Sequence, residues 1–511
     1  MKRILALTLI LALCLAAFAA CGKQSGGETN TPSAESSPGV QVGLASEQPG
    51  TPPEGGTPPD GGTPPDGGTP PEGTPPAGGP GQPPDGGPGG NPPDGTPPAG
   101  GPGGPGGGPG GMGQDTTSEP AVVTKGEATG LTDKDGGAVC SGSAVITFGG
   151  TQKTLSAAYL IDGVEVDITS GEYASASANN DEVVFLIVNG GRLNIEGSAS
   201  SPVSVSKTGS AASGGQVNDD YNFYGINSGI VAAGSGSEAV IKNASITTAS
   251  PGSNAVVATN GGSVTITDSS IETTGQAGSR GLHATYAGTI TADNVSIRTQ
   301  GNSSAALATD RGGGTVTASN MTLETNSAGS PLVYSTGTIA VSYSAGSANN
   351  AQMVVVEGGS RADLDSCEFT CSGGGNRTGT SEIDSSSHTI DACGIFIYQS
   401  FSGDASEGTD YFTAKNCRLT VTGANVPMFY ITNIIADIEL DGNEFTYSSD
   451  YLFVCEETSE WGSRGSNGGS AAVTLNAQDI SGSKAFVGTS SSSLEFKAKT
   501  DPGVTIVNGT W

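Results

Sequence analysis

The feature that most restricts the fold of this chain is a repeat about 25 residues long. Segments 254–279, 280–304 and 305–330 align one beneath the other, and each holds three short runs of alternating Val, Ile and Thr between Gly, Asn and Ser. Alternation with a period of two indicates β-strands, and helical periodicity is absent. A fixed period of this length is typical of units that stack and share one continuous core. The sequence therefore predicts an all-β repeat protein.

One column of the alignment sets the register. Three residues before the apolar residue of the third strand stands a residue that favours turns, and Asn, Asp and Gly tolerate the left-handed backbone of a sharp corner. Before that corner, Val264 and Ile266 are predicted to face inward, and Thr265 and Thr267 to face outward. The predicted corner column consists of Asn243, Asp268, Asn294, Asn320, Ser366, Asn416 and Gly442.

A stacked asparagine corner between short strands resembles the asparagine ladder of right-handed parallel β-helices, the pectate-lyase-like solenoids. Residues 160–511 are also similar in texture to adhesin-like β-helix surface proteins of bacteria. The resemblance implies a right-handed parallel β-helix over residues 119–511, with corner side chains hydrogen-bonded along a stack that water reaches poorly. It says little about function, because unrelated activities share this scaffold. Glycosylation is the alternative use of Asn243, Asn294 and Asn320, which begin N-x-S/T sequons.

The N-terminus has the pattern of an export signal. Residues 1–3 (MKR) precede an apolar run over residues 4–20, which is short for a membrane span and typical of a secretory signal. Residues 18–21 (FAAC) resemble the lipobox of bacterial lipoproteins, which implies removal of residues 1–20 and lipidation of Cys21. Two acyl chains give a stable anchor. We expect an extracytoplasmic, membrane-anchored protein at the cell surface; ordinary signal cleavage is the alternative.

Residues 21–118 are predicted to form a disordered tether. TPPEGG at 51–56 and TPPDGG at 57–62 and 63–68 give way to runs of Gly and Pro. No residue type in this segment builds a core, so the composition favours disorder. The predicted organisation is a signal peptide (1–20), a Pro/Gly-rich spacer (21–118) and a β-helix domain (119–511).

The net charge of -30 argues against nucleic acid as a partner, because phosphate binding requires clustered Lys and Arg. The chain has two His and no CxxC motif, so the ligand spacings of zinc sites are absent. We expect no cofactor. The acidic charge is compatible with Ca²⁺, but no motif supports a calcium site.

Six cysteines follow Cys21 in the sequence: Cys140, Cys367, Cys371, Cys393, Cys417 and Cys455. Cys367 and Cys417 each stand one residue after a corner, in what the alignment gives as adjacent units. Neighbouring units lie about 4.8 Å apart, within the Cα range of a disulfide. Disulfides are stable outside the cytoplasm. The pair is predicted to be either a disulfide or two buried thiols.

Function is expected where insertions interrupt the repeat, at residues 207–224, 372–392, 399–411 and 455–470. The last two project from the corner where Asp310 and Arg311 stand a few units earlier. Aromatic, acidic and guanidinium groups along one edge suit a polysaccharide, which needs flat apolar faces and fixed polar groups. The alternative is that these side chains only pin their own loops. The candidate ligand-binding residues are Asp310, Arg311, Tyr398, Phe401, Asp404 and Trp461, with Asp410 and Glu456 on the same edge.

Catalytic patterns are weaker. No compact Asp cluster stands beside Arg or Lys, His283 and His388 lack a nucleophile, and the acids in the inserted loops are expected to be solvated. We therefore expect a non-enzymatic, adhesin-like or polysaccharide-binding surface module. A polysaccharide lyase or glycoside hydrolase with a loop-built site is the first alternative, and a structural stalk is the second.

Overall fold

A computed structural model describes residues 119–176, 178–213, 217–375, 377–383, 385–400, 408–458, 468–489 and 491–509. The predicted signal peptide, Cys21 and the tether lie outside these residues. Within them the fold is almost entirely β, with one short helix, α2 (Asp219–Tyr224), so the all-β prediction is confirmed. None of the helical structure in this part of the chain is long and apolar enough to cross a membrane.

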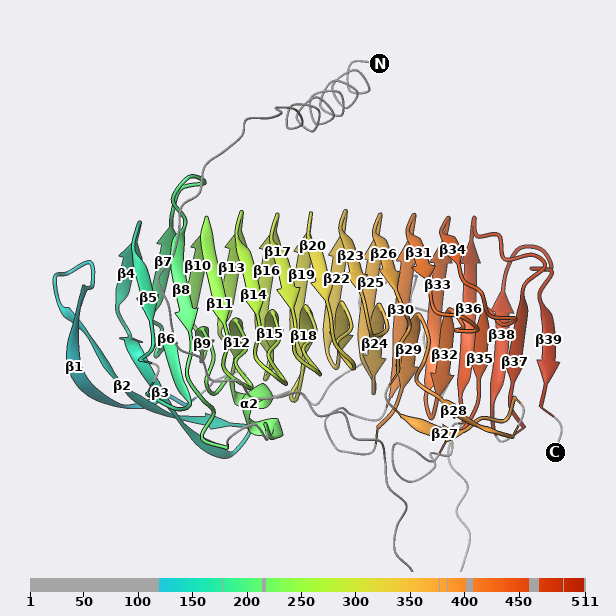
Figure 1. The fold of residues 1–511 in the computed structure, drawn as a ribbon, viewed down its shortest axis with the longest axis horizontal. Helices are drawn as coiled ribbons and strands as arrows, with labels where there is room; N and C mark the ends of the chain where they lie inside the picture. The colour runs from blue at the N-terminus through green and yellow to red at the C-terminus, as the bar shows by residue number, and fades with distance from the viewer. Residues whose placement is uncertain are drawn as a thin grey trace, which may run out of the picture. The chain divides into compact units, whose positions relative to one another are not determined.

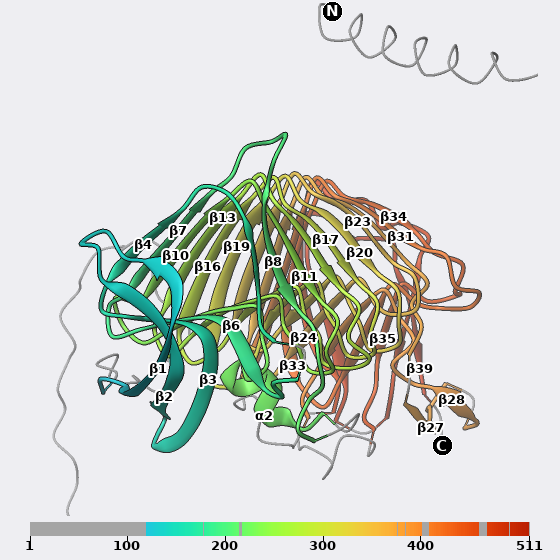
Figure 2. The ribbon, with the colours of Figure 1, turned by 60° about the vertical axis from the view of Figure 1, so that its left-hand side comes forward.

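Successive strands from β4 to β35 enter three long sheets in rotation, apart from the inserted hairpin β27–β28 (Figures 1 and 2). Sheet A contains, in spatial order, β1 (Val122–Thr132), β2 (Ala138–Phe148), β3 (Thr151–Asp162), β6 (Glu182–Val188), β9 (Ile230–Ala233), β12 (Val256–Thr259), β15 (Leu282–Ala284), β18 (Leu307–Thr309), β21 (Val333–Ser335), β24 (Val354–Glu357), β29 (Ile395–Tyr398), β32 (Phe429–Thr432), β35 (Phe453–Cys455), β37 (Lys484–Val487) and β39 (Thr505–Asn508).

Sheets B and C run beside sheet A, and their described neighbouring strands are all parallel. Sheet B contains β38 (Ser493–Lys497), β36 (Ser470–Asn476), β33 (Ile435–Asp441), β30 (Thr409–Lys415), β25 (Arg361–Asp365), β22 (Thr338–Ser342), β19 (Gly314–Ser319), β16 (Gly288–Asp293), β13 (Ser263–Thr267), β10 (Glu238–Lys242), β7 (Arg192–Glu196) and β4 (Glu165–Ile168). Sheet C contains β34 (Glu444–Thr446), β31 (Arg418–Val421), β26 (Glu368–Cys371), β23 (Ala345–Ala348), β20 (Thr322–Thr325), β17 (Ser296–Thr299), β14 (Ser270–Thr273), β11 (Ala244–Thr248), β8 (Val203–Lys207) and β5 (Glu172–Ala174).

The core is built from matched columns of branched side chains. In sheet B, Val264 lies beside Ile290 and Ile266 beside Ala292. These side chains are buried, whereas Thr265 between them faces outward and is only half-buried. Because each inward position repeats from unit to unit, apolar side chains stack directly on one another and form one continuous cluster.

All seven predicted corner residues have a positive φ, from 50° at Asn243 to 66° at Gly442. Tyr343 and Ala477 occupy the same column, with φ of 51° and 49°. The sequence alignment missed both, because Tyr and Ala do not favour the left-handed region. Asp268 and several other members are exposed, so the expectation of a corner that water reaches poorly was wrong.

Successive corners are linked mainly by backbone hydrogen bonds. The N–H of Asn243 donates to the carbonyl that precedes the next corner, and the N–H groups of Asp268 and Asn294 do the same. Among side chains, Asn294 reaches the carboxylate of Asp268. Asn320 instead reaches Asp293, which is not a corner residue. A regular stack of corner amides is therefore replaced by individual bonds of different kinds.

A second column, made of serines, was not predicted. Ser253, Ser279, Ser304 and Ser330 are fully buried. The backbone N–H of each of the first three donates to the hydroxyl of the next serine, at 3.3, 2.9 and 2.9 Å. These hydroxyls satisfy amides at a buried turn that cannot reach water. A spacing of 25 or 26 residues between the serines was the available signal in the sequence.

Two additions depart from the parallel pattern. Strand β2 pairs antiparallel with both β1 and β3, and β3 pairs in parallel with β6. The hairpin of β27 (Thr378–Thr380) and β28 (Ser387–Thr389) lies in the 372–392 insertion. The insertion does not disturb the register, because β24 and β29 still pair residue for residue.

Of the two alternatives for Cys367 and Cys417, the structure has the pair of buried thiols, because both cysteines are free. The two cysteines do lie in adjacent units, since Glu368 pairs with Arg418. However, the backbone N–H of Cys367 donates to Cys417 Sγ at 3.4 Å. Residues at the same position in neighbouring parallel units point their Cβ atoms in the same direction, so one sulfur lies against the backbone of the other cysteine.

Candidate functional site

The candidate site lies on the outer face of sheet A, where two neighbouring columns hold aromatic and acidic side chains. Tyr334, Val355, Phe396, Tyr430 and Val454 are successive register partners and form the first column. The second column lies two residues further along each strand. It contains Asp310, Thr336, Glu357, Tyr398, Thr432 and Glu456.

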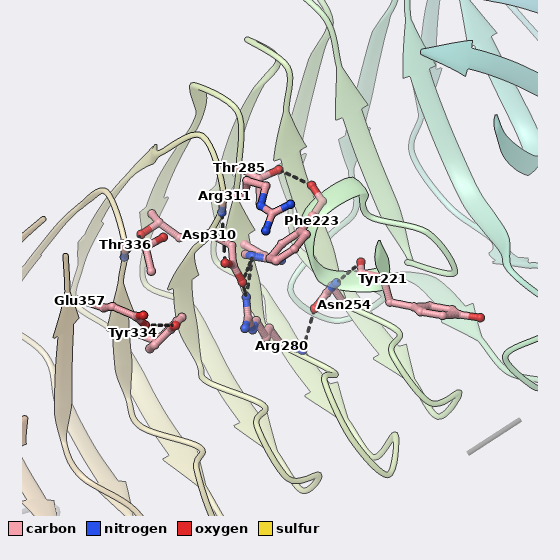
Figure 3. A network of polar contacts seen from close by, with 12 residues as sticks. Tyr221, Phe223, Asn254, Arg280, Thr285, Asp310, Arg311, Tyr334, Thr336 and Glu357 are labelled. Carbon is pink, nitrogen blue, oxygen red and sulfur yellow. Dashed lines mark hydrogen bonds and ion pairs between the residues drawn. The ribbon is translucent and has the colours of Figure 1, made fainter. Parts of the chain in front are cut away.

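Asp310 belongs to a buried network with Arg280 and His283 (Figure 3). Arg280 donates through Nη1 to Asp310 Oδ2 and, at 2.8 Å, to Nε2 of His283. Burial lowers the pKa of His283 well below its usual range, and the positive charge of Arg280 lowers it further. The imidazole is therefore neutral and accepts the bond, while Asp310 compensates the charge of Arg280.

Arg311 is directed toward helix α2 (Figure 3). Its backbone N–H donates to Asp310 Oδ1 at 3.1 Å, and its guanidinium carbon lies 4.1 Å from the centroid of the Phe223 ring. Thr285 pins the same segment by donating to the carbonyl of Phe223 at 2.9 Å. The Arg311 side chain therefore packs against α2.

Glu357 lies beneath two tyrosines. Tyr334 and Tyr398 both donate to its Oε2, at 2.6 and 2.7 Å, and Ser400 donates to Oε1. The carboxyl group is 1% exposed. Burial raises its pKa, although the three hydroxyl donors lower it, and the charge of Asp310 raises it further. The guanidinium carbon of Arg280 lies 5.3 Å from the Tyr334 ring centroid and connects the two networks.

Two acids expected to be solvated in loops are in fact buried. Asp410 is 0% exposed, and its Oδ1 accepts a 2.9 Å bond from the backbone N–H of Ser360. Burial raises its pKa well above the usual range. The expectation of a solvated group was wrong because Asp410 is the second residue of β30 and belongs to sheet B.

Glu456, the other acid, is also 0% exposed. Its carboxylate accepts bonds from Tyr430 at 2.6 Å, from the Ser381 hydroxyl at 2.9 Å and from the backbone N–H of Glu382 at 2.7 Å. Ser381 and Glu382 stand in the turn of the β27–β28 hairpin. The buried acid therefore fastens this hairpin to sheet A.

Two pockets open beside the hairpin. The first has a volume of about 210 Å³, and the residues that line it include Arg280, Tyr334, Gln352, Arg377, Phe396 and Tyr398. Arg377 is exposed and makes no ion pair with any residue that the structure describes. The second has a volume of about 380 Å³ and is lined by Tyr430, Tyr451, Val454 and Glu456, among others.

The structure brings Asp310 and Tyr398 into one connected network and directs Arg311 away from it. Phe401, Asp404 and Trp461 lie outside the described residues. Sequence reasoning missed four residues of the first pocket or its floor: Arg280, Tyr334, Glu357 and Arg377. Tyr334 falls in a unit that is absent from the predicted corner column, whereas Glu357 belongs to the unit with the corner Ser366; each continues a column of sheet A.

Among the described residues, no group of three or more His, Cys, Asp or Glu side chains is arranged to hold a metal ion. The carboxyl groups of the site instead accept hydrogen bonds from N–H and O–H groups of the protein. Comparison with protein-family models, with curated proteins and with solved structures finds no match for this chain.

Proposed function

We propose that this chain is a lipid-anchored bacterial surface protein whose C-terminal domain is a right-handed parallel β-helix that binds extracellular polysaccharide. The rotation of strands through three parallel sheets, with a sharp corner in every unit, supports the β-helix. The signal-like N-terminus, the motif at Cys21 and the Pro/Gly spacer support an anchored domain held away from the membrane.

The observation that carries the binding function is the first pocket. Tyr334, Phe396 and Tyr398 offer aromatic surface, and Arg280 and Arg377 offer donors. Glu357 fixes both tyrosine hydroxyls, so the polar groups are set in place before a ligand arrives. Stacking on aromatic faces beside preorganised donors and acceptors is how proteins commonly recognise sugars.

A polysaccharide hydrolase or lyase is the second candidate, favoured by one observation. Glu357 is a carboxyl group with a raised pKa, and the Arg280-paired carboxylate of Asp310 is close enough to influence it. Two acids in different environments can serve as general acid and base. However, three hydroxyl groups cover Glu357, so a sugar in the pocket would contact the tyrosines rather than the carboxyl. The geometry therefore favours binding over catalysis.

The full chain should be tested on a glycan array, together with assays for reducing sugars and unsaturated uronides. We expect binding without turnover, and at least a tenfold loss of affinity in Arg377→Ala, about the effect of one charge-assisted hydrogen bond. Arg418→Ala is the control, because Arg418 is also exposed but lies on sheet C. Turnover of any polysaccharide would support the enzyme instead, and failure to bind any glycan would support a stalk.

The lipid anchor has a separate test. Cells expressing the full chain are fed a labelled fatty acid, and the membrane and medium fractions are compared. We expect label on the wild-type chain, and we expect Cys21→Ser to be unlabelled and released. Label retained by the Cys21→Ser variant would contradict the assignment.

A further inference from the structure

The two arginines of the first pocket stand beside its two tyrosines. Arg280 lies between β14 and β15, and its guanidinium carbon is 5.3 Å from the ring centroid of Tyr334 (Figure 3). Arg377 stands directly before β27 and acts on Tyr398. Burial raises the pKa of Tyr398 well above its usual range, and the positive charge of Arg377 opposes that rise. Guanidinium groups from two distant parts of the chain therefore line one pocket of about 210 Å³.

Arg280 is held in place but retains donors without partners. The residue is 8% exposed, and its Nη1 donates to both Asp310 and His283. Nε is buried and has no hydrogen-bond partner among the described residues, and no described acceptor pairs with Nη2 either. Nε and Nη2 form one edge of the planar guanidinium group, so a whole edge lacks an acceptor from the described protein. An oxyanion in the pocket would supply that acceptor through Nη2.

Arg377 supplies positive charge that the described residues do not balance. Its side chain is exposed and forms no ion pair with any of them. Its backbone N–H donates to Oδ1 of Asp391 at 2.9 Å, which fixes the main chain without engaging the guanidinium group. Asp391 also lines the pocket but is only 6% exposed, and Asp310 compensates the charge of Arg280. The charge that attracts an anion therefore comes mainly from Arg377, and Arg280 adds directed donors.

We propose that this pocket selects a sugar that carries a tetrahedral oxyanion, a sulfate or phosphate ester, an inference that rests on the polysaccharide-binding function proposed above. Such an ester has terminal oxygens that point in different directions, so it can accept bonds from two guanidinium groups, one beside each tyrosine. A uronate carboxylate has both oxygens in one plane and is matched by the fork of a single arginine. The rings of Tyr334, Phe396 and Tyr398 would hold the sugar beside its ester.

Two experiments separate this inference from the function on which it rests. The first is calorimetric titration of the full chain with inorganic sulfate and with inorganic phosphate, which needs no sugar. The second is a glycan array that holds each backbone in unmodified, sulfated, phosphorylated and uronate forms. We expect at least one ion to bind, and its ester to bind at least about tenfold more tightly than the unmodified backbone, the effect of one charge-assisted hydrogen bond. The preferred ester identifies the oxyanion.

The outcomes distinguish the two proposals. Glycans that bind equally well with and without the ester would overturn the oxyanion inference and leave polysaccharide binding intact. A uronate form that binds as tightly as the esters would overturn the preference for a tetrahedral group. Binding of an ion without binding of any glycan would support the oxyanion site and overturn the polysaccharide function. Failure of both ions and all glycans to bind would overturn both proposals.

Variants locate the oxyanion. Arg377→Gln removes the charge and should lower affinity for the ester about tenfold, and it should remove most of the preference over the unmodified backbone. Arg280→Lys keeps a charge but loses the planar edge, so it should weaken the ester as well. Arg377 is exposed, which keeps the test valid if the buried substitution impairs folding. Arg418→Gln on sheet C is the control for charge alone. An unchanged ester preference in both Arg377→Gln and Arg280→Lys would place the oxyanion elsewhere and overturn the inference.

Discussion

The side-chain amide of Asn294 donates a 2.8 Å hydrogen bond to the carboxylate of Asp268 in the preceding repeat unit. Both residues stand at the same corner, both have a positive φ, and both are exposed to solvent. A water-exposed bond contributes little on its own, because water competes for both partners. The conformation that Asn and Asp tolerate is therefore the main reason for their presence at this corner.

Replacing Asn294 separates the contribution of its side-chain hydrogen bond from that of its left-handed backbone conformation. Asn294→Leu should lower the free energy of unfolding by about 1–2 kcal/mol, because Leu is strained in the left-handed region. Asn294→Gly should cost much less, because glycine adopts this conformation freely. Denaturant titration of both variants gives the comparison. Equal losses would mean that the side-chain bond, and not the backbone conformation, dominates at this corner.

Tyr343 offers the reverse experiment. It adopts φ of 51° and is 66% exposed, so its ring gains little from packing while its backbone is strained. Tyr343→Asn should raise the free energy of unfolding by about 1 kcal/mol. Tyr343→Ala removes the ring without relieving the strain and serves as the control. A Tyr343→Asn variant less stable than the Ala variant would contradict the argument.

Glu357 should make stability depend on pH. Its pKa is raised in the folded chain, so the stabilising contribution is complete below the unfolded pKa and is lost as pH rises through the folded pKa. Glu357→Gln cannot ionise. The melting temperature of this variant, relative to wild type, should therefore increase as pH rises from 4 to 8. Each unit by which folding raises the pKa of Glu357 corresponds to about 1.4 kcal/mol of stability.

The matched control for that experiment is Glu444→Gln, an exposed position on sheet C. The difference between Glu357→Gln and wild type should change with pH more steeply than the difference between this control and wild type. A Glu357→Gln difference that is flat with pH, or that falls, would show that the buried carboxyl is not protonated preferentially in the folded state.

Cys367 and Cys417 should remain reduced when the protein is purified without reductant. The hydrogen bond between the two sulfurs raises the pKa of the Cys367 thiol but lowers that of Cys417, so the reason is geometric. Both thiols are buried, and the sulfur of Cys417 lies against the backbone N–H of Cys367. Alkylation under denaturing conditions followed by peptide mass spectrometry should find both cysteines labelled. A linked pair of peptides containing residues 367 and 417 would instead establish the disulfide.

The repetitive part of the fold was accessible from sequence because one side-chain type recurs at one structural position. Val264 and Ile266 alternate with threonines, and the corner residues share a tolerance for positive φ, so both columns could be counted. Tyr343 and Ala477 broke that rule, and the unit around Tyr343 was left out of the alignment. Neighbouring units impose the corner there, an effect that local propensity does not report.

The site was harder to predict, because it depends on contacts between units. Asp310 and Tyr398 do lie in one column of sheet A, but Glu357, which lies between them, was not recognised, because its place in that column follows from the pairing of β24 with β21 and β29. Asp410 and Glu456 stood in apparently polar loops. Their burial follows from strand pairing and from the hairpin, which are separated from them by up to 75 residues in sequence.

The 372–392 insertion leaves and re-enters the stack without altering the pairing of β24 with β29. The strands therefore form a constant framework, and the hairpin is an insertion that can be exchanged on it. Evolution can replace the hairpin, and with it one wall of both pockets, without changing the packing of the strands beneath it. Related chains that share this stack could thus diverge rapidly in what they recognise while their frameworks remain almost superimposable.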